Sequence, residues 1–384
     1  MFPLTALPLG MLLFGIFEVG AFKSIQKVFQ GRVGWVLEAY RWLSILHFVG
    51  FMLTLFLPIG VLVRSVQTAL FVFFSIPYLL KIIFALICKA PIKTAFVVMI
   101  LSVVGLGSVL VYGMVEGAYR YQVRRSVVKI KNLPASFDGF KIVHISDFHI
   151  GSLWRLDRVG AGVRLINAQK ANVVFFTGDY VNSRADEMTP FLPMLKTIKA
   201  PLGVFCILGN HDYGTHNWFA TNQEKARQGV LIQKIPALLG WQLLRNQHQF
   251  LHRGADSIAV LGVENWGDSR QNGRHGNLPK AHAGTERVAV KLLLSHDPLH
   301  WQQQVTQDFK DIAFTFSGHT HGMQIGFDNA VLRWSPMQYI YAQWAGIYQI
   351  GFQYLNVNRG FGVGLYPGRL GIWPEISVIE LKKY

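Results

Sequence analysis

The chain has few charged residues and almost no cysteine. Asp, Glu, Lys and Arg make up 15% of its 384 residues, whereas they make up about a quarter of an ordinary soluble protein. The two cysteines, Cys88 and Cys206, form no CxxC pair and cannot build a disulfide framework. They therefore exclude a disulfide-stapled fold and leave the redox compartment undefined.

Several common binding patterns are also missing. GxxxxGK[ST] and GxSxG do not occur, and Gly360, Gly362 and Gly364 lack the strand–turn–helix frame of a dinucleotide loop. No run of Lys and Arg alternates with aromatic residues as in a nucleic-acid groove. We attribute the net charge of +16 to basic loops of a membrane protein, and nucleic acid is not expected as a partner.

Hydrophobic residues make up 51% of the chain, and they are concentrated in residues 1–119. A bilayer span takes about 20 apolar residues, and four stretches reach that length: 1–22, 42–63, 66–88 and 94–115. The first lacks a basic start and carries Glu18, so we interpret it as a span rather than a signal peptide; an interfacial helix is the alternative. The sequence predicts a multi-pass cell-membrane protein with an α-helical transmembrane region at 1–118.

The segment 119–140, "YRYQVRRSVVKIKNLPASFDGF", joins this region to the rest of the chain. We interpret it as a basic juxtamembrane linker at the lipid headgroups, ending in the turn residues "NLPASFDG". Membrane lipids are therefore expected partners. Basic residues number six on each side of the predicted spans, so the positive-inside rule leaves the side of the following domain open.

From Lys141 onward, short apolar runs end abruptly in polar residues. The runs are "KIVHISDFHIG", "ANVVFFTGDYVN", "GVFCILGNHDYG", "SIAVLGVEN", "VKLLLSHDP" and "IAFTFSGHTHG". Their Val, Ile, Phe and Leu cores are typical of buried strands. Helix-like stretches at 155–170 and 187–199 lie between some of them, which predicts an α/β domain over 141–384.

Acidic, imidazole and amide side chains follow five of these six runs. They are Asp147, His149, Asp179, Asn210, His211, His296, His319 and His321. Ligands of such sheets bind beyond the carboxyl ends of the strands. Side chains at i and i+2 point to the same side of an extended chain, so His319 and His321, for example, can reach one place. A single strand-end histidine is more often structural, but the ordered set predicts a metal site.

The order D-x-H, GD, GNHD, SHD, GHTH resembles the calcineurin-like metallophosphoesterases, in particular their membrane-attached branch. The resemblance covers about residues 139–382, including the late "NRG" turn and "PEI" strand. It implies a four-layer αββα sandwich with two mixed sheets between helices. Met323 replaces a common glycine, and "VGLYPGR" at 363–369 departs from the usual Thr/Ser-Gly-Leu-Pro-x-Arg pattern; both leave the substrate preference open.

The resemblance also implies a role for each motif residue. Asp147, His149 and His321 would hold one metal, whereas Asn210, His296 and His319 would hold a second, and Asp179 would bridge the two. His211 would stand near the substrate as proton donor or phosphate binder, with Asp212 orienting its imidazole.

Such a site implies a metal-dependent phosphohydrolase that acts on phosphomonoesters or phosphodiesters through a hydroxide shared by two divalent cations. Four imidazoles, two carboxylates and one amide suit Mn, Fe, Zn or Co better than Mg. Nearby spans favour a lipid-linked or envelope-related substrate. The alternative is a non-catalytic membrane sensor or scaffold that retains the metal site. The oligomeric state is not predicted.

Aromatic residues cluster at 334–354. The members are Trp334, Tyr339, Tyr341, Trp344, Tyr348, Phe352 and Tyr354. Such a cluster fits either a membrane interface or a hydrophobic core, and we predict core.

Overall fold

The computed structural model describes residues 38, 42, 92–214, 221–267, 275–364 and 366–384. The chain divides into two compact units, 1–112 and 113–384. Helix α4 (Ile92–Val115) matches the fourth predicted span. Within the described ranges, one stretch is long and apolar enough to cross a membrane, Ile100–Tyr119. Apart from Trp42, the spans predicted at 1–22, 42–63 and 66–88 lie outside the described residues.

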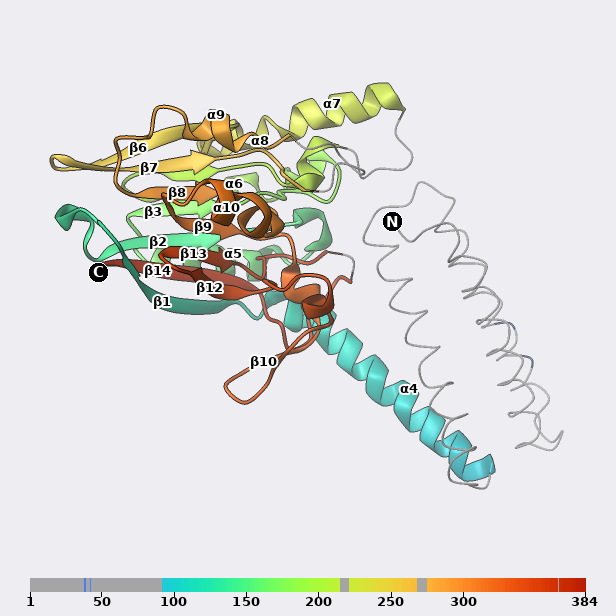
Figure 1. Ribbon diagram of the computed structural model, residues 1–384. Coiled ribbons are helices and arrows are strands. Elements are labelled where there is room, and N and C mark those ends of the chain that lie inside the picture. Colours follow the sequence, from blue (N-terminus) through green and yellow to red (C-terminus); the bar gives the residue numbers. More distant parts are fainter. Residues whose placement is uncertain (1–37, 39–41, 43–91, 215–220, 268–274, 365) are drawn as a thin grey trace. The chain divides into compact units, whose positions relative to one another are not determined.

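The second unit contains two six-stranded mixed sheets (Figure 1). The first has the order β1 (Gln122–Ile130), β14 (Glu375–Lys383), β2 (Phe140–Ile145), β3 (Val173–Phe176), β4 (Val204–Cys206) and β5 (Gln242–Leu243). Strands β2 to β5 run parallel, and β14 is antiparallel to β2.

The second sheet has the order β12 (Gly346–Ile350), β13 (Gln353–Val357), β9 (Ile312–Ser317), β8 (Lys291–Leu294), β7 (Asp256–Gly262) and β6 (Gln247–Arg253). Its four central strands are parallel, and its two edge strands, β12 and β6, are antiparallel to their neighbours. A separate two-stranded hairpin pairs β10 (Phe327–Asp328) with β11 (Arg333–Trp334).

Strand β3 explains why the central strands are apolar throughout. Val173 and Phe175 join a core that also contains Phe314 and other residues of the second sheet. Their neighbours Val174 and Phe176 point to the opposite face, into a different core. Because successive side chains alternate between faces and both faces are covered, a continuous apolar run is required.

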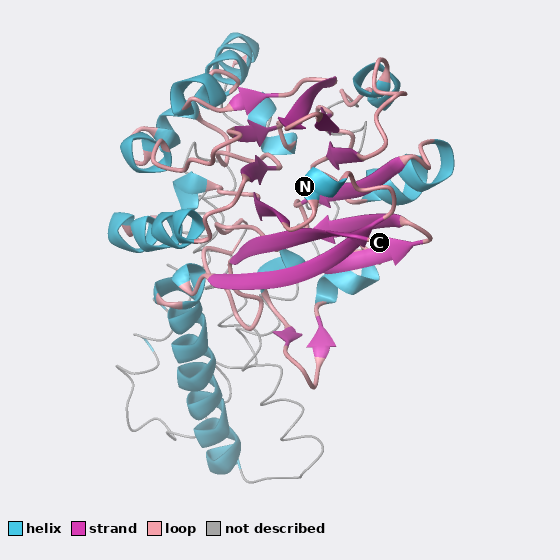
Figure 2. Ribbon diagram, turned by 90° about the vertical axis from the view of Figure 1, so that its left-hand side faces the viewer, coloured by secondary structure: helices cyan, strands magenta, loops and turns pink. Residues whose placement is uncertain are grey.

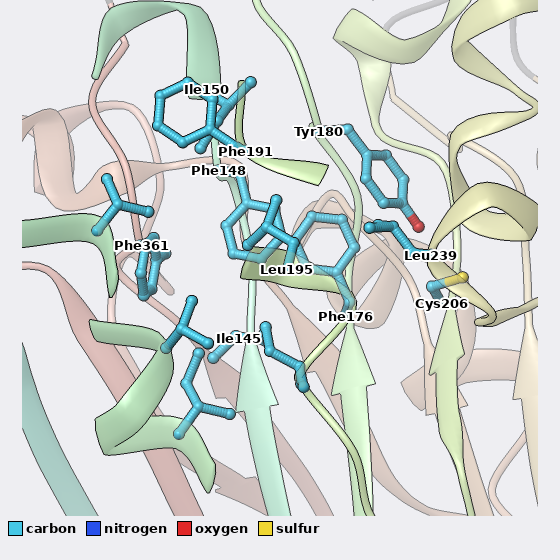
Figure 3. Close-up of a cluster of buried hydrophobic side chains, with 14 of the residues drawn as sticks. Ile145, Phe148, Ile150, Phe176, Tyr180, Phe191, Leu195, Cys206, Leu239 and Phe361 are labelled. Atoms are coloured by element: carbon cyan, nitrogen blue, oxygen red, sulfur yellow. The ribbon is translucent and has the colours of Figure 1, made fainter. Parts of the chain in front are cut away.

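Helices cover the outer face of each sheet (Figure 2). On the first sheet they are α5 (Leu156–Ala168), α6 (Leu192–Leu195) and α8 (Ile235–Leu239), and Leu195 and Leu239 lie in the same buried cluster as Phe176 (Figure 3). On the second sheet they are α9 (Leu278–His282) and the helical segment Trp301–Val305, which continues into α10 (Thr306–Asp308). The unit therefore has the four layers that the resemblance implied.

The segment 119–140 is not a linker, because it contains strand β1. This strand pairs with β14 along its full length, so the folded unit begins near Gly113 rather than at Lys141. Arg125 and Lys129 are exposed, whereas Val128 and Ile130 are buried. Two of the basic residues that suggested a headgroup segment, Arg125 and Lys129, thus occupy solvent-facing positions of an edge strand.

Two other expectations differ from the structure. The helix predicted at 187–199 is reduced to α6 and flanking turns. Pro190 and Pro193 lack the N–H donor that a helix interior needs, and Pro193 is accommodated in the first turn of α6. The aromatic cluster at 334–354 is divided rather than wholly core: Trp344 is buried, whereas Tyr339 and Phe352 are exposed.

Candidate metal centre

The candidate residues follow the carboxyl ends of strands in both sheets. Asp147, Asp179 and Asn210 come after β2, β3 and β4, and His296 and His319 come after β8 and β9. The two sheets meet here, because the backbone N–H of His319 donates to both carboxylate oxygens of Asp147 at 3.1 Å. All eight predicted strand-end residues are therefore brought to one edge of the sandwich.

The backbone at this edge is not extended, contrary to the basis of the sequence argument. Five candidate ligands have left-handed φ angles: Asp147 (54°), His149 (40°), Asp179 (61°), His319 (70°) and His321 (50°). This conformation costs about 1–2 kcal/mol for a residue with a Cβ atom, and such strain gathers at functional sites. The i and i+2 pairs do converge, but they converge through tight left-handed turns.

One group of donors consists of Asp147, His149 and His321, whose ligand atoms all lie within 4.8 Å of one another. Nε2 of His321 is 3.5 Å from Oδ1 of Asp147. The chain crosses closely here, because a Cβ atom at Gly318 would lie 2.1 Å from Oδ2 of Asp147. Glycine at position 318 is therefore required for the approach of the two loops.

A second group consists of Asp179, His296 and His319 within the same distance limit. The amide oxygen of Asn210 joins it, at 3.0 Å from Nε2 of His296 and 3.0 Å from Nδ1 of His319. Asn210, His296 and His319 are the set that the resemblance assigned to one metal.

Asp179 lies between the two groups. Its Oδ2 atom is 3.3 Å from Nε2 of His149 and 3.2 Å from Nε2 of His296. Its Oδ1 atom accepts the backbone N–H of His211 at 2.9 Å. One carboxylate therefore faces an imidazole of each group, which is the position that a bridging ligand needs.

The surroundings of His296 show that the donor set fits a cation. Nδ1 of His296 is 2.7 Å from the carbonyl oxygen of Thr177, so Nδ1 carries the proton, and Nε2 of the neutral ring presents a lone pair. That lone pair faces oxygens of Asp179 and Asn210. Electron pairs that face one another in a buried site need a positive charge between them, supplied by a proton or a metal ion.

The pKa values agree with this preference for positive charge. Burial alone would lower the pKa of His296, but the charge and hydrogen bond of Asp179, together with the charge of Asp147, raise it to about 10. Burial likewise opposes ionisation of Asp179, yet the positive charges of His296 and His211 hold its pKa well below the usual value. A bound metal would replace the proton in the same electrostatic environment.

His211 and Asp212 do not interact as the resemblance implied. Nδ1 of His211 donates to the carbonyl oxygen of Asn182 at 2.6 Å. The Asp212 carboxylate instead accepts backbone N–H groups of Asp179 and Gly209 at 2.8 Å and of Tyr180 at 2.9 Å. Burial and the Asp179 charge raise the pKa of Asp212 to about 7. Asp212 therefore holds the turn that carries Asp179, and Asn182 orients His211.

Three residues that support the site escaped the sequence analysis. The side-chain oxygen of Asn182 is 3.2 Å from Nδ1 of His149, and the Tyr341 hydroxyl is 3.0 Å from Nε2 of His319. Nη2 of Arg369 is 3.3 Å from Nδ1 of His321. No motif marks Asn182 or Tyr341. Arg369 closes the "VGLYPGR" segment, which was noted for its departure from the family pattern and not for this contact.

Comparison with known proteins places this geometry in a family. The calcineurin-like phosphoesterase model matches residues 140–323. The chain is 30% identical over 263 residues to YkuE, an uncharacterized metallophosphoesterase of Bacillus subtilis (strain 168), with 66% of this chain and 83% of the relative covered.

Two vertebrate proteins are also similar, and both are named transmembrane protein with metallophosphoesterase domain. The Danio rerio protein is 27% identical over 283 residues, covering 71% of this chain and 60% of the relative. The Bos taurus protein is 28% identical over 305 residues, covering 77% and 63%. The chain thus spans less than two thirds of the length of these two relatives.

The α/β fold and the clustered carboxylate, imidazole and amide donors at its strand ends are those of a metallophosphoesterase. The chain belongs to the calcineurin-like phosphoesterase family. Its side chains form groups able to hold metal, and among its described residues one stretch, Ile100–Tyr119, is long and apolar enough to cross a membrane.

Proposed function

We propose that this protein is a membrane-anchored phosphohydrolase that uses two divalent cations to hydrolyse phosphomonoesters or phosphodiesters. The position of Asp179 between His149 and His296 is the observation that carries the proposal. In this scheme Asp147, His149 and His321 hold one cation, and Asn210, His296 and His319 hold the other. The mixed nitrogen and oxygen donors suit Mn, Fe, Zn or Co.

The chain itself supplies the proton chemistry. Two bound cations would offset the charge of the phosphate and lower the pKa of a bound water. The hydrogen bond from Nδ1 of His211 to Asn182 makes Nε2 the nitrogen that exchanges protons with a substrate. The backbone of His211 is bonded to Asp179, so this imidazole is held beside the centre, and we assign it the role of proton donor to the leaving oxygen.

Membrane attachment defines the substrate class within this proposal. Helix α4 would be the last of four spans, preceded by those predicted at 1–22, 42–63 and 66–88. An anchored chain would encounter phosphate esters at the bilayer surface. We therefore propose a lipid-linked phosphate ester as the substrate.

The test is metal binding and hydrolysis by the full-length protein in detergent. After removal of metal and titration with Mn²⁺, we expect two ions per chain and hydrolysis of bis-p-nitrophenyl phosphate. Asp179→Asn should weaken Mn²⁺ binding and lower the rate at least about 100-fold, because even outer-shell changes cost about 10–100-fold. Asp186→Asn alters an exposed carboxylate of the same segment and should change neither.

Other results of this experiment would contradict the proposed function. Binding of two ions without hydrolysis of any phosphate ester tested would favour the sensor or scaffold alternative. Absence of stoichiometric Mn²⁺ binding would refute the two-cation site. So would an Asp179→Asn variant with the Mn²⁺ affinity and hydrolysis rate of the parent protein.

A further inference from the structure

The β10–β11 hairpin, residues 326–335, exposes apolar side chains at its tip. Val331 is 97% exposed, and Phe327 and Leu332 are also exposed. The tip is a formed turn, because the side-chain oxygen of Asn329 accepts the N–H groups of Val331 and Leu332, each at 2.9 Å. The tip residues 329–332 carry no charge, and the hairpin projects away from the sheets (Figure 1). Such a surface is costly in water.

The turn after the hairpin extends this surface. Tyr339 is 77% exposed and Ile340 is 64% exposed. The Trp334 indole N–H is 3.5 Å from the Tyr339 hydroxyl, which links the turn to strand β11. Tryptophan and tyrosine are enriched where protein meets the bilayer interface, so the composition favours lipid over a purely aqueous setting.

The base of the hairpin is linked to the candidate membrane span through Arg369 and Leu370. The Gly326 N–H donates to the carbonyl oxygen of Leu370 at 2.9 Å, and the Arg369 N–H donates to that of Gly113 at 3.0 Å. A Cβ atom at Gly113 would lie 2.8 Å from the Leu370 side chain. Gly113 lies within the stretch Ile100–Tyr119. If that stretch occupies a bilayer, these contacts hold the base of the hairpin near the residues with which the stretch ends.

Another exposed aromatic residue, Trp154, contacts the last residue of the stretch. Tyr119, the last residue of the stretch, accepts the backbone N–H of Trp154 on its hydroxyl at 3.0 Å. Trp154 and Leu156 are exposed, and the guanidinium of Arg155 lies over the Trp154 ring. Aromatic and basic side chains together are suited to a surface of anionic headgroups.

The hairpin is also joined directly to the metal-site loop. The Ser335 hydroxyl donates to the carbonyl oxygen of Gly322 at 2.7 Å, and Gly322 follows His321. Met323 and Ile325, each 39% exposed, continue the apolar surface from His321 toward the hairpin. A substrate with its apolar part in lipid could follow this surface and present its phosphate to the site.

We propose that hairpin 326–335 and the turn at 336–340 form a membrane-contact surface that inserts into the headgroup and upper acyl region of the bilayer beside the metal centre. This inference rests on the proposed membrane attachment and phosphoesterase site. It adds the element that brings lipid-linked substrates to the site. The occupant is a lipid bilayer, because a span end and interfacial aromatic residues adjoin the surface and no charged side chain lies at its tip.

The first experiment measures where the tip lies. Full-length protein with Cys88→Ser and Val331→Cys is labelled with an environment-sensitive fluorophore and reconstituted into phosphatidylcholine–phosphatidylglycerol vesicles. Cys206 can remain, because it is buried and burial raises the pKa of its thiol to about 12. The control label is placed by Val230→Cys on α7 (Asn222–Ile232), where the native side chain is 56% exposed.

We expect nitroxide-labelled lipids to quench the probe at position 331 and aqueous iodide to quench the probe at 230. Similar quenching at both positions would overturn the proposal. Protection of position 331 from iodide without quenching by nitroxide lipid would also overturn it, because protein rather than lipid would then cover the tip.

The second experiment tests the consequence for substrates. The double variant Val331→Asp, Leu332→Asp should keep hydrolysis of soluble bis-p-nitrophenyl phosphate and lose at least about tenfold on phosphatidic acid in vesicles, given the cost of a charge in lipid. Val230→Asp with Leu238→Asp, at two exposed apolar positions outside the hairpin, should affect neither. An equal loss on both substrates would refute the contact role. If the unaltered protein hydrolyses neither, the proposed function fails, and lipid quenching still decides the position of the hairpin.

Discussion

Nη2 of Arg369 lies 3.3 Å from Nδ1 of His321, and both residues are buried. Arg369 also donates to the backbone carbonyls of Arg359 at 2.8 Å and Gly362 at 2.9 Å. Burial, followed by the charges of His149 and Arg369, holds the pKa of His321 well below its usual value. Burial therefore contributes most to keeping His321 neutral, the form in which an imidazole binds metal, and the charge of Arg369 adds to this effect.

Arg369→Lys should weaken the metal centre and destabilise the fold. Lysine keeps a charge but loses the planar fork that reaches several carbonyls and the imidazole. We expect Mn²⁺ affinity to fall about 10–100-fold and the free energy of unfolding to fall by about 2 kcal/mol, because buried carbonyls lose donors. Mn²⁺ titration and unfolding of metal-stripped protein measure the two effects. Arg184→Lys, at a half-exposed ion pair with Asp186, is the control, and unchanged Mn²⁺ affinity in Arg369→Lys would contradict the prediction.

Asp212→Asn should lower the stability of the fold, and weaker metal binding should follow from that loss. The amide can no longer accept all three backbone N–H groups, and an unpaired buried donor costs about 1–3 kcal/mol. We expect a loss of that size in urea unfolding, together with weaker Mn²⁺ binding as the Asp179 turn loosens. If Asp212 acts on His211 alone, the turnover rate will fall while unfolding and metal binding stay as in the parent protein.

The strands could be predicted where both faces of a sheet are covered. The run at 173–176 is apolar throughout because neither side of β3 meets solvent. Edge strands do not carry this signal. Strand β6, "QHQFLHR", buries only Leu251, and the basic strand β1 has an exposed position between two buried ones. Their polar residues therefore look like loop or linker in the sequence.

The ligand candidates were predicted because each follows an apolar run, but their supports could not be. Asn182 reaches His149 across 33 positions, and Arg369 reaches His321 across 48. Two residues this far apart in the sequence give no sign that they are in contact in the fold. The resemblance implied that Asp212 orients the imidazole of His211. In the structure the turn directs its carboxylate to backbone N–H groups instead.

His211→Gln should lower turnover most for substrates with poor leaving groups. A general acid contributes about 10²–10⁴-fold, and a p-nitrophenolate leaving group needs little protonation. We expect a large fall with alkyl phosphate esters, a small one with bis-p-nitrophenyl phosphate, and unchanged Mn²⁺ stoichiometry. Equal losses on both substrate types would instead assign His211 to phosphate binding.

His144 makes the stability of the fold sensitive to acid. Its Nε2 atom is 2.9 Å from the Thr177 hydroxyl, and its Nδ1 atom is 2.8 Å from the Asn356 amide nitrogen. Burial lowers the pKa of His144 to about 3, and the charge of Glu375 opposes this only in part. The unfolded chain takes up the proton near pH 6.5, whereas the folded protein does so only near pH 3. Stability from this residue is therefore complete above pH 6.5 and is lost as the pH falls toward 3.

Between pH 6 and pH 4, His144 should steepen the fall in the free energy of unfolding by about 1.4 kcal/mol per pH unit. His144→Asn removes the titrating group, so its stability should decline less steeply with acid even if it is less stable at pH 7. Urea unfolding of metal-stripped protein in detergent at several pH values measures both slopes. His252→Asn removes an exposed imidazole on β6 and should keep the parental slope. Parallel slopes for the parent protein and His144→Asn would mean that His144 is already protonated in the fold, and its contacts with Thr177 and Asn356 would then need a different proton arrangement.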